Sequence, residues 1–187
     1  MCDEAGEAGK DIAVACFYLD FAAQKEQSAA SILGALLKQV VAGFKPIPTE
    51  IMDAFRKHEK VIGGRALQLP EIVKLLGNLS SIRHTFVRLD ALDKCAPAER
   101  AKVLRSLNDI IEISPTTRVF LTGRPHIGGE VGRHLPGGAG FVSISPRKAD
   151  IIRYIGAKLA EDTTSDEMDE TLEAEIMKRI PEAFSEI

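Results

Sequence analysis

Four short apolar, β-prone runs separated by helix-like stretches constrain the fold of this chain most strongly. The runs are residues 12–19, 85–89, 118–121 and 141–144. Between them, apolar residues recur at the three- and four-residue spacing of amphipathic helices. Strands that alternate with helices are typical of a parallel sheet whose helices form the crossovers. The sequence therefore predicts an α/β fold in which these runs are strands of one parallel sheet.

The helix-like stretches have recognisable starts and stops. Serine or proline precedes or opens several of them, and Gly43 with Pro46 ends the first. The first helical stretch is expected to begin at Ser28 or Ser31 and to end at Gly43. The other stretches expected to be helical are residues 49–60, 69–79, 97–113, 146–159 and 168–180.

Polar residues follow directly after two of the apolar runs. Asp90 and Asp93 come after the second run, and Thr122 and Arg124 come after the third. Buried parallel strands deliver such residues to the carboxyl edge of an α/β sheet, so we expect the four to lie near one another. Carboxylates suit a magnesium ion, and a guanidinium suits the phosphates that such an ion carries. Together they predict half of a nucleotide site.

The phosphate-binding half of such a site has no counterpart in these 187 residues. No Gly-x-x-x-x-Gly-Lys followed by Ser or Thr occurs. The stretch 6–11 (Gly-Glu-Ala-Gly-Lys-Asp) resembles it, but its glycines are two residues too close and Asp11 replaces the hydroxyl residue. The glycine-rich stretch 137–140 leads into a strand-like run and is interpreted as a loop.

Composition narrows the class of protein further. With 45% hydrophobic residues the chain can form about one domain with a core. Residues 161–187 hold ten acidic and two basic residues, a net charge of -8, which leaves +5 on residues 1–160. This acidic end and the lack of a basic stripe argue against nucleic acid as a partner. No apolar run reaches the roughly 18 residues that span a membrane. We therefore expect a cytoplasmic protein with no membrane or nucleic-acid binding.

Cysteines and histidines form no pattern that indicates chemistry. Cys2, Cys16 and Cys95 are odd in number and widely spaced, which argues against a disulfide framework and a zinc site. No two of the four histidines lie at the i, i+4 spacing of a helical metal-ligand pair. We expect reduced, mostly buried thiols and no metal held by histidine.

Four ordered motifs, residues 15–20 (Ala-Cys-Phe-Tyr-Leu-Asp), 32–39, 90–95 (Asp-Ala-Leu-Asp-Lys-Cys) and 122–125 (Thr-Gly-Arg-Pro), resemble those of fungal NACHT domains. These domains belong to the signal-transducing (STAND) P-loop NTPases and are often catalogued as nephrocystin-3-like N-terminal domains. The resemblance covers about residues 14–159. It implies a three-layer parallel sheet of the P-loop NTPase type, incomplete because the first strand and phosphate loop are missing. That central strand would lie between the third and fourth runs.

The resemblance also implies roles for the four polar residues. Asp90 resembles the Walker B carboxylate that holds magnesium, and Asp93 resembles the second acid, which polarises the attacking water. Arg124 resembles the sensor arginine that reports the γ-phosphate of ATP or GTP, with Thr122 beside it. Lys94 departs from the family pattern, because many members have an acidic residue there.

Arg88 is a second departure, since it interrupts an apolar strand on the same face as Phe86 and Asp90. A buried, unpaired guanidinium would cost several kcal/mol, so we expect access to solvent or a carboxylate partner, either Asp20 or Asp90.

We therefore expect the chain to have three segments. They are a disordered N-terminal stretch (1–11), a partial NACHT core (12–160), and an acidic linker with the start of a following helical segment (161–187). As a fragment of a nucleotide switch, the chain is expected to bind neither magnesium nor ATP or GTP tightly. It would act through protein partners or self-association through flanking domains. The alternative is part of an active NTPase whose phosphate loop lies upstream or in a partner chain.

Overall fold

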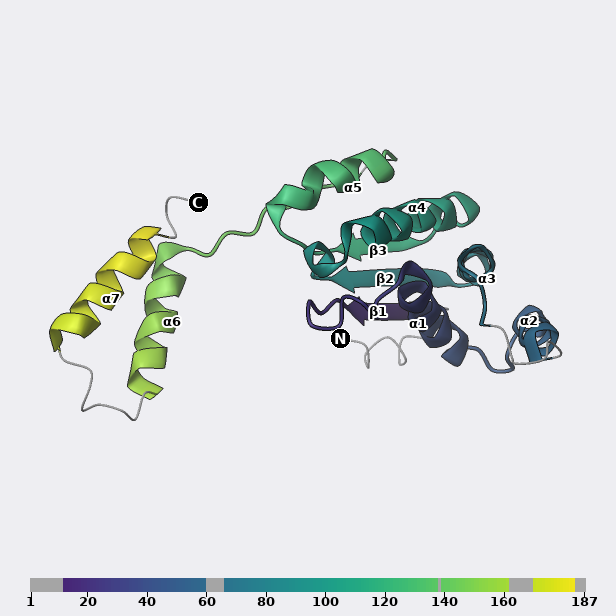
Figure 1. Ribbon diagram of the computed structural model, residues 1–187, viewed down its shortest axis with the longest axis horizontal. Helices are drawn as coiled ribbons and strands as arrows, with labels where there is room; N and C mark the ends of the chain where they lie inside the picture. Colours follow the sequence, from purple (N-terminus) through teal and green to yellow (C-terminus); the bar gives the residue numbers. More distant parts are fainter. Residues whose placement is uncertain (1–11, 60–65, 138, 162–169, 184–187) are drawn as a thin grey trace. The chain divides into compact units, whose positions relative to one another are not determined.

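The structure is a computed structural model that describes residues 12–59, 66–137, 139–161 and 170–183. The chain forms two compact units, Met1–Gly140 and Phe141–Ile187 (Figure 1). The first unit contains the sheet and most of the helices, and the second contains two helices. The expected disordered stretch 1–11 lies outside the described residues.

A three-stranded parallel sheet forms the centre of the first unit. Its strands are β1 (Ile12–Tyr18), β2 (His84–Asp90) and β3 (Arg118–Leu121), in the order β1-β2-β3. These strands coincide with the first three apolar runs, so the predicted α/β class with a parallel sheet is confirmed. The fourth predicted strand, 141–144, is wrong: those residues have no regular structure, and Phe141, Val142 and Ile144 are exposed.

Two helices of the first unit start where the sequence supplies side-chain partners for free backbone N–H groups. Ser28 Oγ accepts a hydrogen bond from the Ser31 N–H (3.2 Å), and Glu71 accepts one from the Gln68 N–H (2.9 Å). The helices are α1 (Ala29–Ala42), α2 (Thr49–Glu59), α3 (Leu69–Ile82), α4 (Pro97–Ile113) and α5 (Gly128–His134), with short 3-10 turns η2 (Leu92–Lys94) and η3 (Pro125–Ile127).

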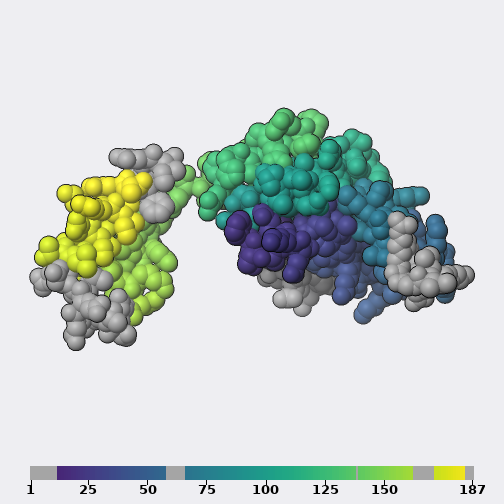
Figure 2. Space-filling view, viewed as in Figure 1, coloured from purple at the N-terminus to yellow at the C-terminus, as the bar shows by residue number. Residues whose placement is uncertain are grey.

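Helices cover one face of the sheet. Crossovers between parallel strands are right-handed, so three strands in sequential order place their connecting helices on the same side. Helices α1, α3 and α4 contact one another there. Figure 2 shows the described residues of this unit packed closely together. Burial alternates along the central strand, with Thr85, Val87 and Leu89 buried beneath this layer.

The opposite face carries the alternate residues of each strand, and no helix in the described part of the first unit covers it. Arg88 and Phe120 are exposed there, and Phe86 is half-buried. The described residues therefore form two layers, where the sequence led us to expect three. The expected third layer follows from a central strand and its helix, which these residues do not supply.

The second unit consists of α6 (Lys148–Glu161) and α7 (Glu170–Ala183), which contact each other. They match the helices expected at 146–159 and 168–180 apart from shifts at the ends; residues 168–169 lie outside the described ranges. Helix α5 was not predicted. None of the described helices is both long and apolar enough to cross a membrane.

Candidate functional site

The end of β2 meets the end of β3 through a hydrogen-bonded pair of side chains. Asp90 is the last residue of β2, and Thr122 follows β3 directly. Thr122 Oγ1 donates to Asp90 Oδ1 and also accepts a hydrogen bond from the Ala91 N–H (3.0 Å). The expectation that both residues reach the same carboxyl edge is confirmed, since parallel neighbours end together.

Asp93 lies on the same edge, on the turn η2. Its side chain is only 7% exposed, and Oδ1 accepts a hydrogen bond from the Arg124 N–H (3.3 Å). Arg124 Nε lies 3.6 Å from Asp93 Oδ2, and Lys94 Nζ lies 3.8 Å from the same oxygen. Two cations therefore face one carboxylate, so Lys94 offsets the charge of Asp93 at this edge.

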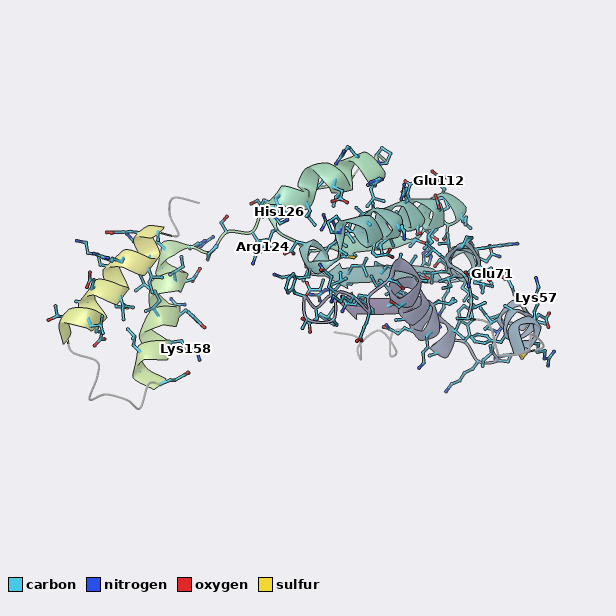
Figure 3. All side chains as sticks on the ribbon, in the orientation of Figure 1. Lys57, Glu71, Glu112, Arg124, His126 and Lys158 are labelled. Carbon is cyan, nitrogen blue, oxygen red and sulfur yellow. The ribbon has the colours of Figure 1, made fainter. Side chains whose placement is uncertain are left out.

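Arg124 is positioned by backbone geometry, and its side chain stays accessible. Figure 3 shows Arg124 at the end of the sheet to which the strand arrows point. Its side chain is 70% exposed. Gly123 precedes it at a close approach, because a Cβ there would lie 2.6 Å from Ile127 Cδ1. The loop after β3 thus packs tightly on η3 and places the guanidinium beside Asp93 while leaving it exposed to solvent.

The positive charge of Arg88 within β2 is compensated by contact with solvent and by a nearby carboxylate. Its side chain is 44% exposed, its Nη2 lies 3.8 Å from Asp90 Oδ1, and its guanidinium carbon lies 5.8 Å from the centre of the Tyr18 ring. Of the two predicted partners, Asp90 is the one that the structure places beside it. At this exposure the ion pair is worth at most about 1 kcal/mol, so its main effect is to place a third cation at the carboxylate pair.

Two features of this edge had no signal in the sequence. Ala91 adopts a left-handed conformation (φ 56°), which turns the chain sharply after β2 and brings Asp93 back toward β3. The Leu92 N–H then donates to the Thr122 carbonyl (2.8 Å). Gln24, from the loop after β1, donates through Nε2 to the Lys94 carbonyl (2.8 Å). Glycine is the usual marker of such a turn, and alanine gives no warning of it.

Cys95, next to the site, is a buried structural thiol. Burial raises the pKa of this thiol to about 11, with Arg100 opposing that shift. At neutral pH it is protonated and therefore a poor nucleophile or metal ligand. The prediction of a buried thiol is confirmed for this residue.

The oxygen atoms at this edge are too few to coordinate magnesium without further ligands. Asp90 and Thr122 supply a carboxylate and a hydroxyl, and Asp93 is engaged by two cations. Within the described ranges, no cluster of three or more His, Cys, Asp or Glu residues could hold a metal. Mg²⁺ is usually held by one or two carboxylates plus substrate phosphates, so this donor set fits an ion that arrives with a nucleotide.

A groove of about 500 Å³ between α3 and α4 lies outside this site, because none of the four candidate residues lines it. Leu69, Val73 and Ile113 form apolar walls, with Lys74 and Arg105 beside them. The groove therefore adds nothing to the chemistry at the sheet edge.

Comparison with known families gives a match over most of the first unit. The family described as "Nephrocystin 3, N-terminal" matches residues 2–124, which is more than half of the chain. No curated protein and no solved structure matches the chain significantly. The matched residues include β1, β2, β3 and all four candidate residues.

Proposed function

The chain belongs to the nephrocystin 3 N-terminal family, and we propose that it is part of a NACHT-type, signal-transducing nucleotide switch that does not bind or hydrolyse nucleotide by itself. The observation that carries this proposal is the convergence of two carboxylates, a hydroxyl and an exposed arginine at one carboxyl edge of a parallel sheet. Charge-stabilising groups of this kind are what phosphoryl transfer requires.

Each residue of the edge has a role in the proposed switch. Asp90, held by Thr122, would bind the magnesium ion of a nucleotide; that ion offsets phosphate charge when bound. Asp93 would orient the attacking water. Arg124 now faces Asp93 and would exchange this carboxylate for the γ-phosphate, since its exposed side chain can move.

The described residues supply too little to hold a triphosphate. Phosphate loops provide a nest of backbone N–H donors and a lysine, and no such motif occurs in the sequence. Carboxylates repel phosphate unless a cation intervenes. Arg88, Lys94 and Arg124 already lie near Asp90 or Asp93, so these carboxylates partly neutralise the positive charge that a phosphate would need.

Isothermal titration of the chain with ATP or GTP in excess magnesium tests this proposal. We expect no saturable binding at low micromolar nucleotide and no release of phosphate. Asp90→Ala serves as the matched control, because it removes the proposed magnesium ligand from a partly exposed position. Saturable micromolar binding that Asp90→Ala abolishes would show that the chain is a working nucleotide-binding domain.

The second candidate is an active NTPase whose phosphate loop lies in upstream sequence. The exposed β3 edge favours it, because a further strand could pair there. An extended protein that carries a strand and a Gly-x-x-x-x-Gly-Lys-Ser loop before residue 12 should then bind nucleotide. In that protein, Lys94→Glu should raise hydrolysis if the ammonium beside Asp93 limits it. If the extended protein does not bind nucleotide, this second candidate is wrong.

The family resemblance also supports a proposal for where the domain acts in the cell and what it contacts. We place the domain in the cytoplasm, where it would act through protein partners or self-association through flanking domains. The fungal STAND assignment rests on the same motifs, at residues 90–95 and 122–125.

A further inference from the structure

The groove between α3 and α4 is an open surface on the helical layer of the first unit. It has a volume of about 500 Å³, and its outer side is open. The strand and helix that the family resemblance would add belong to the β3 edge and to the uncovered face of the sheet. The groove lies on the other side of the sheet, so its accessibility does not depend on them.

A close contact between the two helices closes one end of this groove. A Cβ on Gly77 would lie 2.9 Å from Ile113 Cδ1, so the lack of a side chain at Gly77 lets the last residue of α4 pack directly on α3. Leu69 and Val73, two turns and one turn before Gly77, form the wall on α3. The wall on α4 runs from Lys102 to Ile113, which is about 16 Å of helix.

The rim of the groove carries positive charge that the described residues do not neutralise. Lys74 on α3 and Arg105 on α4 are exposed, and neither side chain forms an ion pair or a hydrogen bond within the described ranges. Lys102 donates to Glu99 (2.6 Å), so its charge is partly offset. Asp109 supplies the carboxylate among the lining residues. The groove thus combines apolar walls with an excess of positive charge.

We propose that this groove binds an acidic amphipathic helix of a protein partner. Apolar side chains of such a helix would enter between Leu69, Val73 and Ile113. Its flanking carboxylates would approach Lys74 and Arg105, and this charge complementarity selects an acidic helix over a basic one. Ile113 is the apolar anchor, because this large side chain is 42% exposed at the closed end of the groove.

The shape of the groove favours a helix over a small molecule. Small-molecule sites enclose most of the ligand surface, whereas two helices bound this groove and its outer side is open. A helix laid along α4 would cover that side over about three turns and take Ile113 out of water.

A labelled synthetic peptide added to the full chain tests the groove. The probe is a helix-forming peptide of about 18 residues, or five turns, with leucines on one face and glutamates along both flanks. Fluorescence anisotropy should show saturable binding at micromolar concentrations of the chain. A second peptide has lysines in place of the glutamates. It should bind at least about ten-fold more weakly, because it meets Lys74 and Arg105 with like charge.

Substitutions at the rim and at the anchor locate the binding site. Lys74→Glu and Arg105→Glu reverse exposed charges, and each should weaken binding of the glutamate peptide about five-fold. Lys38→Glu, at an exposed mid-helix position of α1 outside the groove, is the matched control and should bind as the wild type does. Ile113→Ala should weaken binding several-fold, whereas Ile82→Ala, at an exposed apolar position of α3 outside the groove, should not. Far-UV circular dichroism confirms that each variant folds.

Exchange of charge separates recognition from a change in folding. The double variant Lys74→Glu, Arg105→Glu should bind the lysine peptide at least about five-fold more tightly than the wild-type chain does, a gain that a damaged fold does not give. Three outcomes overturn the proposal. They are an absence of saturable binding of the glutamate peptide, equal binding of the two peptides to the wild-type chain, and an equal loss of binding in Lys38→Glu and Arg105→Glu.

Discussion

At the scale of the residue, the four polar side chains after β2 and β3 were predictable as a group. Parallel strands end at one edge, so Asp90 and Thr122 had to meet once both runs were strands of the same sheet. Their local partners were less predictable. The contact between Lys94 and Asp93 depends on the turn after β2, and Ala91 gives no sequence signal for a left-handed backbone.

Replacing Ala91 with glycine tests the importance of that turn. The left-handed conformation costs a residue with a Cβ roughly 1–2 kcal/mol, and glycine adopts it freely while losing about 0.5–1 kcal/mol of chain entropy. We expect Ala91→Gly to raise the free energy of unfolding by about 0.5–1 kcal/mol, measured by urea denaturation. Ala101→Gly, in the middle of α4, is the control and should lower it by about 1 kcal/mol. A loss of stability in both variants would contradict the assigned turn.

At the scale of the element, the sequence predicted strands and long helices better than short or isolated segments. Strand and helix periodicities follow from burial on one face, so β2 and α4 were recognisable from their patterns. Helix α5 has only seven residues, three of them glycine, and is held to α4 by an ion pair between the buried Arg100 and the half-buried Glu130 (2.8 Å). The run 141–144 has β-prone residues, yet none of the described strands pairs with it, and propensity alone does not make a strand.

Glu99 links two elements that are distant in sequence, and its loss should be measurable. Its Oε2 accepts from the Ala29 N–H (2.7 Å) at the start of α1, and its Oε1 binds Lys102 (2.6 Å). The Lys102 hydrogen bond, with help from the Ala29 N–H, holds the pKa of the Glu99 carboxyl below its ordinary value. Glu99→Ala should therefore cost about 1 kcal/mol at pH 7, as loss of a helix cap does.

The pH dependence of this effect has a definite sign. A carboxyl group whose pKa is lowered in the folded state contributes stability above its unfolded pKa, here 4.5, and loses it as pH falls through the folded value. Urea denaturation should show the difference between wild type and Glu99→Ala shrinking below pH 4.5. Glu112→Ala, on the same helix (Figure 3), removes only a bond to Asn108 and should cost less than about 0.5 kcal/mol. An equal loss in both variants would contradict the capping role.

At the scale of the whole molecule, the sheet and the helices α6 and α7 belong to different compact units. The sequence led us to treat residues 12–160 as one core because the family resemblance covers about residues 14–159, and the stretch 146–159 has the apolar spacing of a packed helix. Spacing identifies the apolar face of a helix without identifying what covers it. In the structure the main buried cluster draws on residues from Ala13 to Val131, and α6 contributes its one buried side chain, Ile155, outside that cluster.

The composition of that cluster leads to a prediction for the truncated chain. A protein that ends at Gly140 keeps every residue of the cluster and all three strands. We expect it to fold and its free energy of unfolding, measured by urea denaturation followed at 222 nm, to lie within about 0.5 kcal/mol of the full chain's sheet transition. A chain that ends at His134 is the control, since it loses the half-buried Leu135 that packs on the cluster, and should be less stable by about 1 kcal/mol or more. If truncation at Gly140 unfolds the sheet, residues after Gly140 complete its core, as the resemblance to a larger sheet had implied.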